Sequence, residues 1–116
     1  MHPKSPNWLE DIASAITDIA AWTAGLTLVD YERNDLLRSA IERKLEIIGE
    51  ALVRLERSDR ATAARISDYR QIIGFRNRIA HGYDDIDHWQ VWEIITQLLP
   101  VLRAEVEELL GEEDQP

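Results

Sequence analysis

Cysteine is absent from the 116-residue chain, and glycine and proline are scarce, with five and four residues. Without cysteine there is no disulfide framework, no thiolate zinc site and no cysteine nucleophile, so the cytoplasm is the expected compartment. The longest charge-free stretch of the first half, residues 19–29, is much shorter than the roughly 20 residues that cross a bilayer. Acidic residues interrupt the first segment, which therefore does not predict a secretory signal. We expect a cytoplasmic protein without a membrane span.

Basic residues are also few, 13 against 22 acidic ones, which gives a net charge of −9. This balance argues against non-specific binding to nucleic acid, where cationic surface supplies most of the affinity. The acidic residues crowd the C-terminus, and the tail from Gly111 is expected to be frayed. Between residues 65 and 78, four arginines stand against Asp68 alone, so any anion site is expected there.

The remaining composition, 45% hydrophobic and 30% charged, is that of an ordinary globular protein. A chain of this length suffices for one core, so we expect a single domain over residues 1–116. Apolar residues recur at helical spacing, and no run alternates long enough to be a strand. We expect an all-α fold, an antiparallel bundle of four main helices over residues 8–24, 34–57, 68–81 and 87–110, with a short extra helical turn at 61–66.

Several residues mark the ends and contacts of these helices. Gly25 and Gly82 are expected to end the first and third helices, and Pro100 to kink the last. Gly49, inside the longest helix, suggests the close approach of a neighbouring helix. Side-chain oxygens that accept N–H bonds are typical of helix starts. The expected caps are Asn7 with Glu10, Ser67 or Asp68, and Asp87 with Gln90.

The chemistry is concentrated at the end of the third expected helix. Arg76 and Asn77 interrupt its inward side, so they are either paired inside the bundle or line a cleft. Asn77 and His81 share a helical face, whereas Arg76 and His81 are five residues apart and would converge best if a second copy of the chain completed a groove. With Tyr83, these groups suit a phosphodiester, because a guanidinium binds phosphate and an imidazole moves a proton near neutrality. RNA carries its own nucleophile, the 2′-hydroxyl, so neither a metal nor another cofactor is expected.

Each of these residues also has a simpler structural role open to it. Arg76 could pair with a carboxylate such as Glu46 or Glu50, and His81 could complement the dipole of the helix end. Asn77 could hydrogen-bond to the neighbouring helix, which leaves its role open between structure and substrate.

Other residues near this segment have simple expected roles. Tyr83 could pack its ring on the bundle, and Arg78 is expected to be solvated and to add positive potential near a cleft. A metal site among the acidic and histidine residues 81–88 is not expected, because their spacing matches no dedicated site. His2 is expected to be solvated. The tryptophans lie on apolar stripes and are expected to pack in the core rather than stack on bases: Trp8, Trp22, Trp89 and Trp92.

The segment from Arg76 to Tyr83 reads R-x4-H-x-Y with a polar residue after the arginine. It resembles the signature of the HEPN superfamily, in particular its HepT branch. Residues 45–51 (LEIIGEA) and 92–102 (WEIITQLLPVL) resemble two further helices of that family, so that the resemblance covers about residues 34–110.

The resemblance implies a small all-α homodimer with a ribonuclease cleft between its protomers. It also implies a toxin paired with an MNT-type nucleotidyltransferase antitoxin, which can adenylylate the motif tyrosine, here Tyr83. The expected function is a metal-independent endoribonuclease in which His81 is the general acid or base and Arg76 stabilises the transition state. Asn77 and Arg78 would position the RNA substrate. The alternative is a non-catalytic helical module that binds a nucleotidyltransferase and presents its substrate.

Overall fold

The computed structural model describes residues 1–80 and 86–113, and every regular element in these ranges is a helix. Four of them have twelve residues or more, which confirms the all-α fold with four main helices. No helix in these ranges combines the length and the apolar character that a membrane span requires. In chain order the elements are α1 (Ser5–Thr23), α2 (Leu28–Glu32), α3 (Asp35–Ser58), α4 (Arg60–Ala63), α5 (Tyr69–Ala80), α6 (His88–Glu93), the π-helical turn η1 (Ile94–Leu98) and α7 (Leu99–Glu113).

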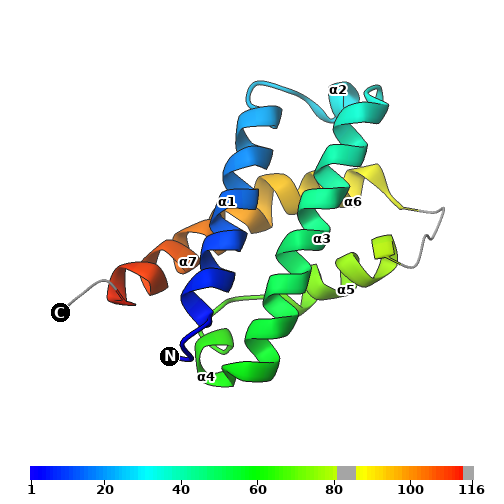
Figure 1. Ribbon diagram of the computed structural model, residues 1–116. Helices are drawn as coiled ribbons and strands as arrows, with labels where there is room; N and C mark the ends of the chain where they lie inside the picture. Colours follow the sequence, from blue (N-terminus) through cyan, green and yellow to red (C-terminus); the bar gives the residue numbers. More distant parts are fainter. Residues whose placement is uncertain (81–85, 114–116) are drawn as a thin grey trace.

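The longest helix, α3, lies at the centre of the molecule (Figure 1). It runs antiparallel to α1 on one side and packs against α5 on the other. The continuous run of α6, η1 and α7 crosses behind α1 and α3 in this view, with α7 against α1. Because α3 packs against both α1 and α5, its residues can join side chains from the two helices in one site.

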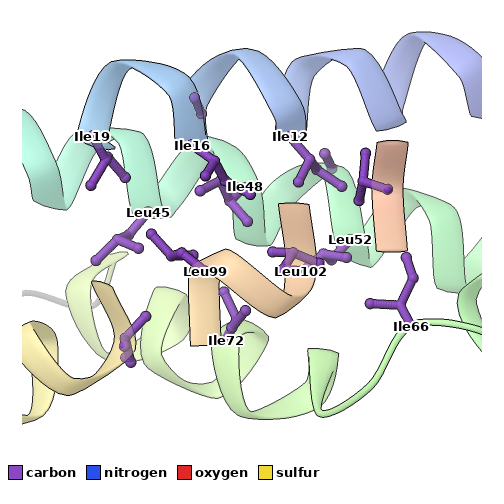
Figure 2. Close-up of a cluster of buried hydrophobic side chains, with 14 of the residues drawn as sticks. Ile12, Ile16, Ile19, Leu45, Ile48, Leu52, Ile66, Ile72, Leu99 and Leu102 are labelled. Carbon is purple, nitrogen blue, oxygen red and sulfur yellow. The ribbon is translucent and has the colours of Figure 1, made fainter. Parts of the chain in front are cut away.

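The core lies between the apolar faces of these helices (Figure 2). Its side chains recur at three- and four-residue intervals, so each helix turns one continuous stripe inward. The stripes of α1 and α3 face each other, and residues of α5 and α7 close the core from the other side. The central members, all at most 3% exposed, include Ile12, Ile16, Ile19, Leu45, Ile48, Leu52, Ile72, Leu99 and Leu102.

Helix α1 begins earlier than predicted, at Ser5, and the expected capping box of Asn7 and Glu10 is wrong. Pro6 lies in its first turn, where a missing N–H costs nothing because those donors have no partner within the helix. The helix ends at Thr23, and Gly25 then adopts a positive φ of 74° that leads the chain out of the helix.

A second short helix, α2, falls where the sequence predicted only a connection. Thr27 accepts a hydrogen bond from the Asp30 N–H, and the Asp30 carboxylate accepts one from the Thr27 N–H, a complete capping box. Tyr31 is fully buried, and burial raises the pKa of its hydroxyl well above its usual range, with a smaller contribution from Glu42. The Thr27-to-Asp30 spacing was the available signal for this helix.

Asp59 ties the N-terminus of the chain to the end of α3. Its carboxylate accepts hydrogen bonds from the Thr62 hydroxyl at 2.7 Å, the Ser5 hydroxyl at 2.7 Å and the His2 backbone N–H at 2.9 Å. The imidazole of His2 stacks on Trp8 with ring centroids 5.5 Å apart. The expectation that His2 is a solvated end is therefore wrong.

We predict that Asp59→Asn lowers the free energy of unfolding by about 0.5–2 kcal/mol at pH 7, because the amide keeps an acceptor for the Thr62 N–H but loses Oδ2, the charged acceptor of three hydrogen bonds. Burial raises the pKa of the Asp59 carboxyl, but the hydrogen bonds from Thr62, His2 and Ser5 outweigh it and hold the pKa well below its usual range. The stabilisation is thus present above the unfolded-state pKa of about 3.9 and is lost as the pH falls through the folded-state value. Urea unfolding at pH 7 and at decreasing pH below 4 measures it.

The control for this prediction is Glu10→Gln, an exposed carboxylate of α1, which is expected to change the free energy of unfolding by less than about 0.5 kcal/mol. A difference between wild type and Asp59→Asn that stayed constant from pH 7 down to pH 2 would contradict the prediction.

The last helix contains a π-helical turn directly before Pro100, where the sequence predicted a kink. The Leu99 N–H donates to the carbonyl of Ile94, five residues back. Proline has no N–H to donate and its ring crowds the preceding turn, which the wider π turn accommodates.

At the start of α6, Asp87 accepts a hydrogen bond from the Trp89 N–H and so caps the helix. The side chain of Gln90 accepts a hydrogen bond from Arg78 instead, so the second half of the predicted capping box is wrong.

Helix α7 continues through Glu113, so the expected fraying from Gly111 is wrong as far as the structure describes the tail, whose residues 114–116 lie outside it. The guanidinium of Arg65 donates to both carboxylate oxygens of Glu112 at 2.6 Å. Glu105 accepts from the backbone N–H and the hydroxyl of Ser67. These pairs fix the acidic helix to the segment before α5.

The start of α5 differs from the predicted caps. Asp68, the residue before the helix, has a positive φ of 56°, unlike the extended backbone of a typical cap.

The prediction that all four tryptophans pack in the core is wrong for two of them. Trp22 and Trp89 are 40% and 58% exposed, whereas Trp8 and Trp92 pack against the core.

Candidate functional site

The site begins where the side chain of Arg76 crosses α3 at Gly49. A Cβ atom at position 49 would lie 2.4 Å from the Cβ and 2.6 Å from the Cγ of Arg76, closer than real contacts allow. The predicted close approach at Gly49 is therefore confirmed, and the group that approaches is the stem of the motif arginine. Glycine at this position makes room for Arg76 to reach across α3.

The guanidinium of Arg76 is held from two helices. Its Nη2 donates to Oε2 of Glu50 on α3 at 2.5 Å, and its Nη1 donates to Oδ1 of Asn77 on α5 at 2.9 Å. Of the two carboxylates considered as partners, Glu50 is the one that pairs with Arg76, whereas Glu46 pairs with Arg43 at 3.5 Å. A guanidinium has five N–H groups, so these bonds fix its plane and, within residues 1–80 and 86–113, leave three donors for another ligand.

Arg76 borders a hollow of about 400 Å³ between α1, α3 and α5. The Arg76 side chain is 28% exposed, so its guanidinium is neither sealed in the core nor free in solvent. The hollow is lined by three arginines, three carboxylates and apolar residues of α1 and α3: Trp8, Asp11, Arg43, Glu46, Ile47, Glu50, Ala51, Arg54 and Arg76.

Glu50 is shared by two arginines. Besides Arg76, it accepts from Nε of Arg54 through its other oxygen, Oε1, at 3.4 Å. One carboxylate thus lies between two guanidinium groups, close to Arg76 and more loosely paired with Arg54. The same two groups are chemically able to hold a phosphate oxygen.

Asn77 and Arg78 do not lie where the sequence placed them. Asn77 is exposed rather than on the inward side, and its amide oxygen faces Arg76. Arg78 is half-buried: its Nη1 donates to Oε1 of Gln90 on α6 at 3.1 Å, and its guanidinium lies 6.0 Å from the Phe75 ring. The expectation that Arg78 is solvated is wrong, because it joins α5 to α6.

The arginines at the start of the basic segment are compensated by carboxylates from other helices. Arg65 pairs with Glu112 of α7, and Arg70 lies 3.3 Å from Glu56 of α3. A hydrogen bond from the Tyr69 hydroxyl lowers the pKa of Glu56, with help from Arg70. The local excess of positive charge in the sequence is therefore balanced in the fold.

Two predicted site residues, His81 and Tyr83, lie outside the described residues, as do Gly82, Asp84 and Asp85. Among the residues that the structure does describe, no group of three or more histidine, aspartate or glutamate side chains is placed to hold a metal ion.

Two residues that line the hollow, Arg43 and Arg54, were not among the predicted site residues. Residues 43, 47, 50 and 54 repeat at four, three and four residues, the spacing of one helical face. That spacing was the available signal, but it does not say that α1 and α5 leave the face open.

The fold and the motif segment define the class: the chain is a HEPN-type all-α domain. The Ribonuclease HepT-like family model matches residues 12–109, and the chain belongs to this family.

Similar proteins are named as ribonucleases. A provisionally named RNase of Caldanaerobacter subterraneus subsp. tengcongensis is 30% identical over 111 residues, which cover 95% of this chain and 98% of the relative. A provisionally named RNase of Methanocaldococcus jannaschii is 30% identical over 86% of this chain and 91% of its own length. A protein of Thermococcus cleftensis named as a probable ribonuclease HepT is 29% identical over 89% and 93%. No solved structure gives a significant match.

Proposed function

We propose that the protein is a metal-independent endoribonuclease toxin that cleaves RNA at a site shared between the two protomers of a homodimer. The observation that carries the proposal is the guanidinium of Arg76 at the edge of an open hollow, where Glu50 and Asn77 hold it and three of its donors bond to no other residue that the structure describes. The family and the names of its members support a ribonuclease.

In this mechanism the RNA supplies the nucleophile. The 2′-oxygen attacks the adjacent phosphorus as a base removes its proton, and the 5′-oxygen leaves as an acid protonates it, which gives a 2′,3′-cyclic phosphate and a 5′-hydroxyl. His81 is proposed for these proton transfers because imidazole titrates near neutrality. Arg76 would stabilise the extra negative charge on the phosphorane-like transition state. Asn77 orients Arg76, and Arg78 would add positive charge near the substrate.

A homodimer is proposed because Arg76 and His81 are five residues apart in the sequence, a spacing that on the helix predicted over residues 68–81 would place them about 140° apart around its axis. A second copy related by a two-fold axis would bring an Arg76 and a His81 from different protomers to one phosphate.

The proposed partner is an MNT-type nucleotidyltransferase antitoxin in the cytoplasm. It would block the toxin by transferring the adenylyl group of ATP to the Tyr83 hydroxyl, two residues after His81: the tyrosine oxygen loses its proton and bonds to the α-phosphorus as pyrophosphate leaves, and the added phosphate would repel RNA.

We predict that the purified protein cleaves RNA in excess chelator and that Arg76→Ala and His81→Ala each lower the rate by about 10²–10⁴-fold, the usual contributions of a positioned charge and a proton donor. The matched control is Arg103→Ala, which removes an exposed arginine of α7 paired with Glu107 and should cleave like wild type. Circular dichroism and light scattering must show folded variants of unchanged oligomeric state. Equal cleavage by all four proteins would overturn the catalytic assignment.

The rival function, a helical module that presents a substrate to a nucleotidyltransferase, is favoured by one observation. Arg76 is already paired with Glu50, which suits an arginine that only joins α5 to α3. This role predicts no cleavage by unmodified wild-type protein and a lowered melting temperature for Arg76→Ala. Cleavage that Arg76→Ala abolishes without such a loss of stability would exclude it.

A further inference from the structure

The hollow beside Arg76 contains two arginines to which the proposed mechanism gives no role. Arg43 and Arg54 lie eleven residues apart on the same face of α3, about 16 Å along its axis. Arg76 reaches α3 between them, at Gly49 and Glu50. The points at which the three arginine side chains meet α3 therefore follow the order Arg43, Arg76 and Arg54 along its axis.

The outer arginines differ from Arg76 in how firmly they are held. Arg76 is 28% exposed and lies 2.5 Å from Glu50, whereas Arg54 and Arg43 are 59% and 69% exposed, with carboxylate distances of 3.4 and 3.5 Å. Exposed pairs at such distances are weak and exchange readily for another anion. Arg54 contacts Glu50 only through Nε, so its terminal nitrogens remain available for a phosphate.

We propose that Arg43 and Arg54 bind the phosphates of an RNA strand on the two sides of the bond to be cleaved, with that bond at Arg76. This assignment rests on the proposed ribonuclease function and adds a binding track to it. The ligand is recognised through its phosphodiester backbone, which suits guanidinium groups spaced along one helix.

The charge of the hollow explains why only particular arginines would matter. The carboxylates of Asp11, Glu46 and Glu50 balance the three arginines, so the lining is neutral as a whole in a protein of net charge −9. General attraction of a polyanion is then small, and the affinity depends on individual contacts between arginine and phosphate. Loss of an arginine outside the hollow should therefore change binding much less than loss of Arg54.

The test measures binding of a fluorescent, uncleavable 2′-O-methyl RNA oligonucleotide to full-length wild-type protein, Arg54→Gln, Arg43→Gln and Arg103→Gln over a series of salt concentrations. Arg103 is matched to Arg54, because each donates through Nε to a glutamate one helical turn away, at 3.1 and 3.4 Å. Cleavage of the corresponding unmodified RNA is measured in parallel, and light scattering reports the oligomeric state.

We expect Arg54→Gln and Arg43→Gln to raise the dissociation constant about three- to tenfold at low salt and to reduce the slope of log K against log salt by about 0.7, the value for one phosphate contact to a single strand. Arg103→Gln should bind like wild type.

If Arg54→Gln and Arg103→Gln bind RNA equally well while the wild type still cleaves it, the proposed binding track is overturned and the proposed ribonuclease function is not. Loss of the dimer in Arg54→Gln also overturns the track, because the hollow is then a protein interface. A wild type that neither binds nor cleaves RNA overturns the proposed function as well.

Discussion

Replacing Gly49 by alanine should lower the rate of RNA cleavage by about 100-fold or more, although position 49 carries no reactive group. The new Cβ would lie 2.4 Å from the Cβ of Arg76, the rigid base of that side chain, so α5 must move away from α3. A guanidinium displaced by about 1 Å from its working position costs a factor of this order. The steric cost exceeds the gain in helix propensity, so the free energy of unfolding should fall by about 1–2 kcal/mol.

The matched control is Gly74→Ala on α5. A Cβ at Gly74 meets nothing within 4 Å, so this variant should gain up to about 1 kcal/mol in stability from helix propensity and cleave at the wild-type rate. Urea unfolding and initial cleavage rates measure both variants. If Gly49→Ala were as stable and as active as Gly74→Ala, the contact between Gly49 and Arg76 would not fix the position of the guanidinium.

The sequence predicted the long helices well where a helix buries one continuous stripe. Helix α3 was expected over residues 34–57 and is found at Asp35–Ser58, because its apolar period and its Asn34 cap are local features. Contacts from distant parts of the chain set the remaining ends. The Asp59 carboxylate accepts a hydrogen bond from Ser5, 54 positions away in the sequence, and Arg65 pairs with Glu112, 47 positions away. The local sequence pattern does not predict pairs between residues so far apart.

The candidate site was predictable in part for the same reason. The motif identified Arg76, and Gly49 signalled a close helix contact, but the sequence left open whether Glu46 or Glu50 is the partner. Residues one turn apart on a helix face differ in what they meet on the next helix, which only the packing of α3 against α5 determines. The roles of His81 and Tyr83 stay predictions.

Glu50→Ala should lower kcat by about 10- to 100-fold with a smaller change in KM, because Glu50 positions Arg76 and does not itself touch the phosphate. Without the carboxylate, the bond to Asn77 is the one that remains to the Arg76 guanidinium among the described residues, so the group can rotate out of the plane that the two partners define. Glu50→Gln retains an acceptor oxygen and should recover part of the rate. Both partners are partly exposed, so the loss of stability should stay below about 1 kcal/mol.

The matched control is Glu107→Gln, since Glu107 is paired with Arg103 on α7 in the same one-turn arrangement as Glu50 with Arg54. Steady-state kinetics with a short RNA separate kcat from KM for all three variants. A purely structural Glu50 would change stability and leave kcat unaltered. A Glu50→Gln enzyme faster than wild type would reverse the interpretation, because the carboxylate would then compete with the phosphate for Arg76. The order wild type, Glu50→Gln, Glu50→Ala in kcat is expected only if an acceptor at this position holds the guanidinium for the transition state.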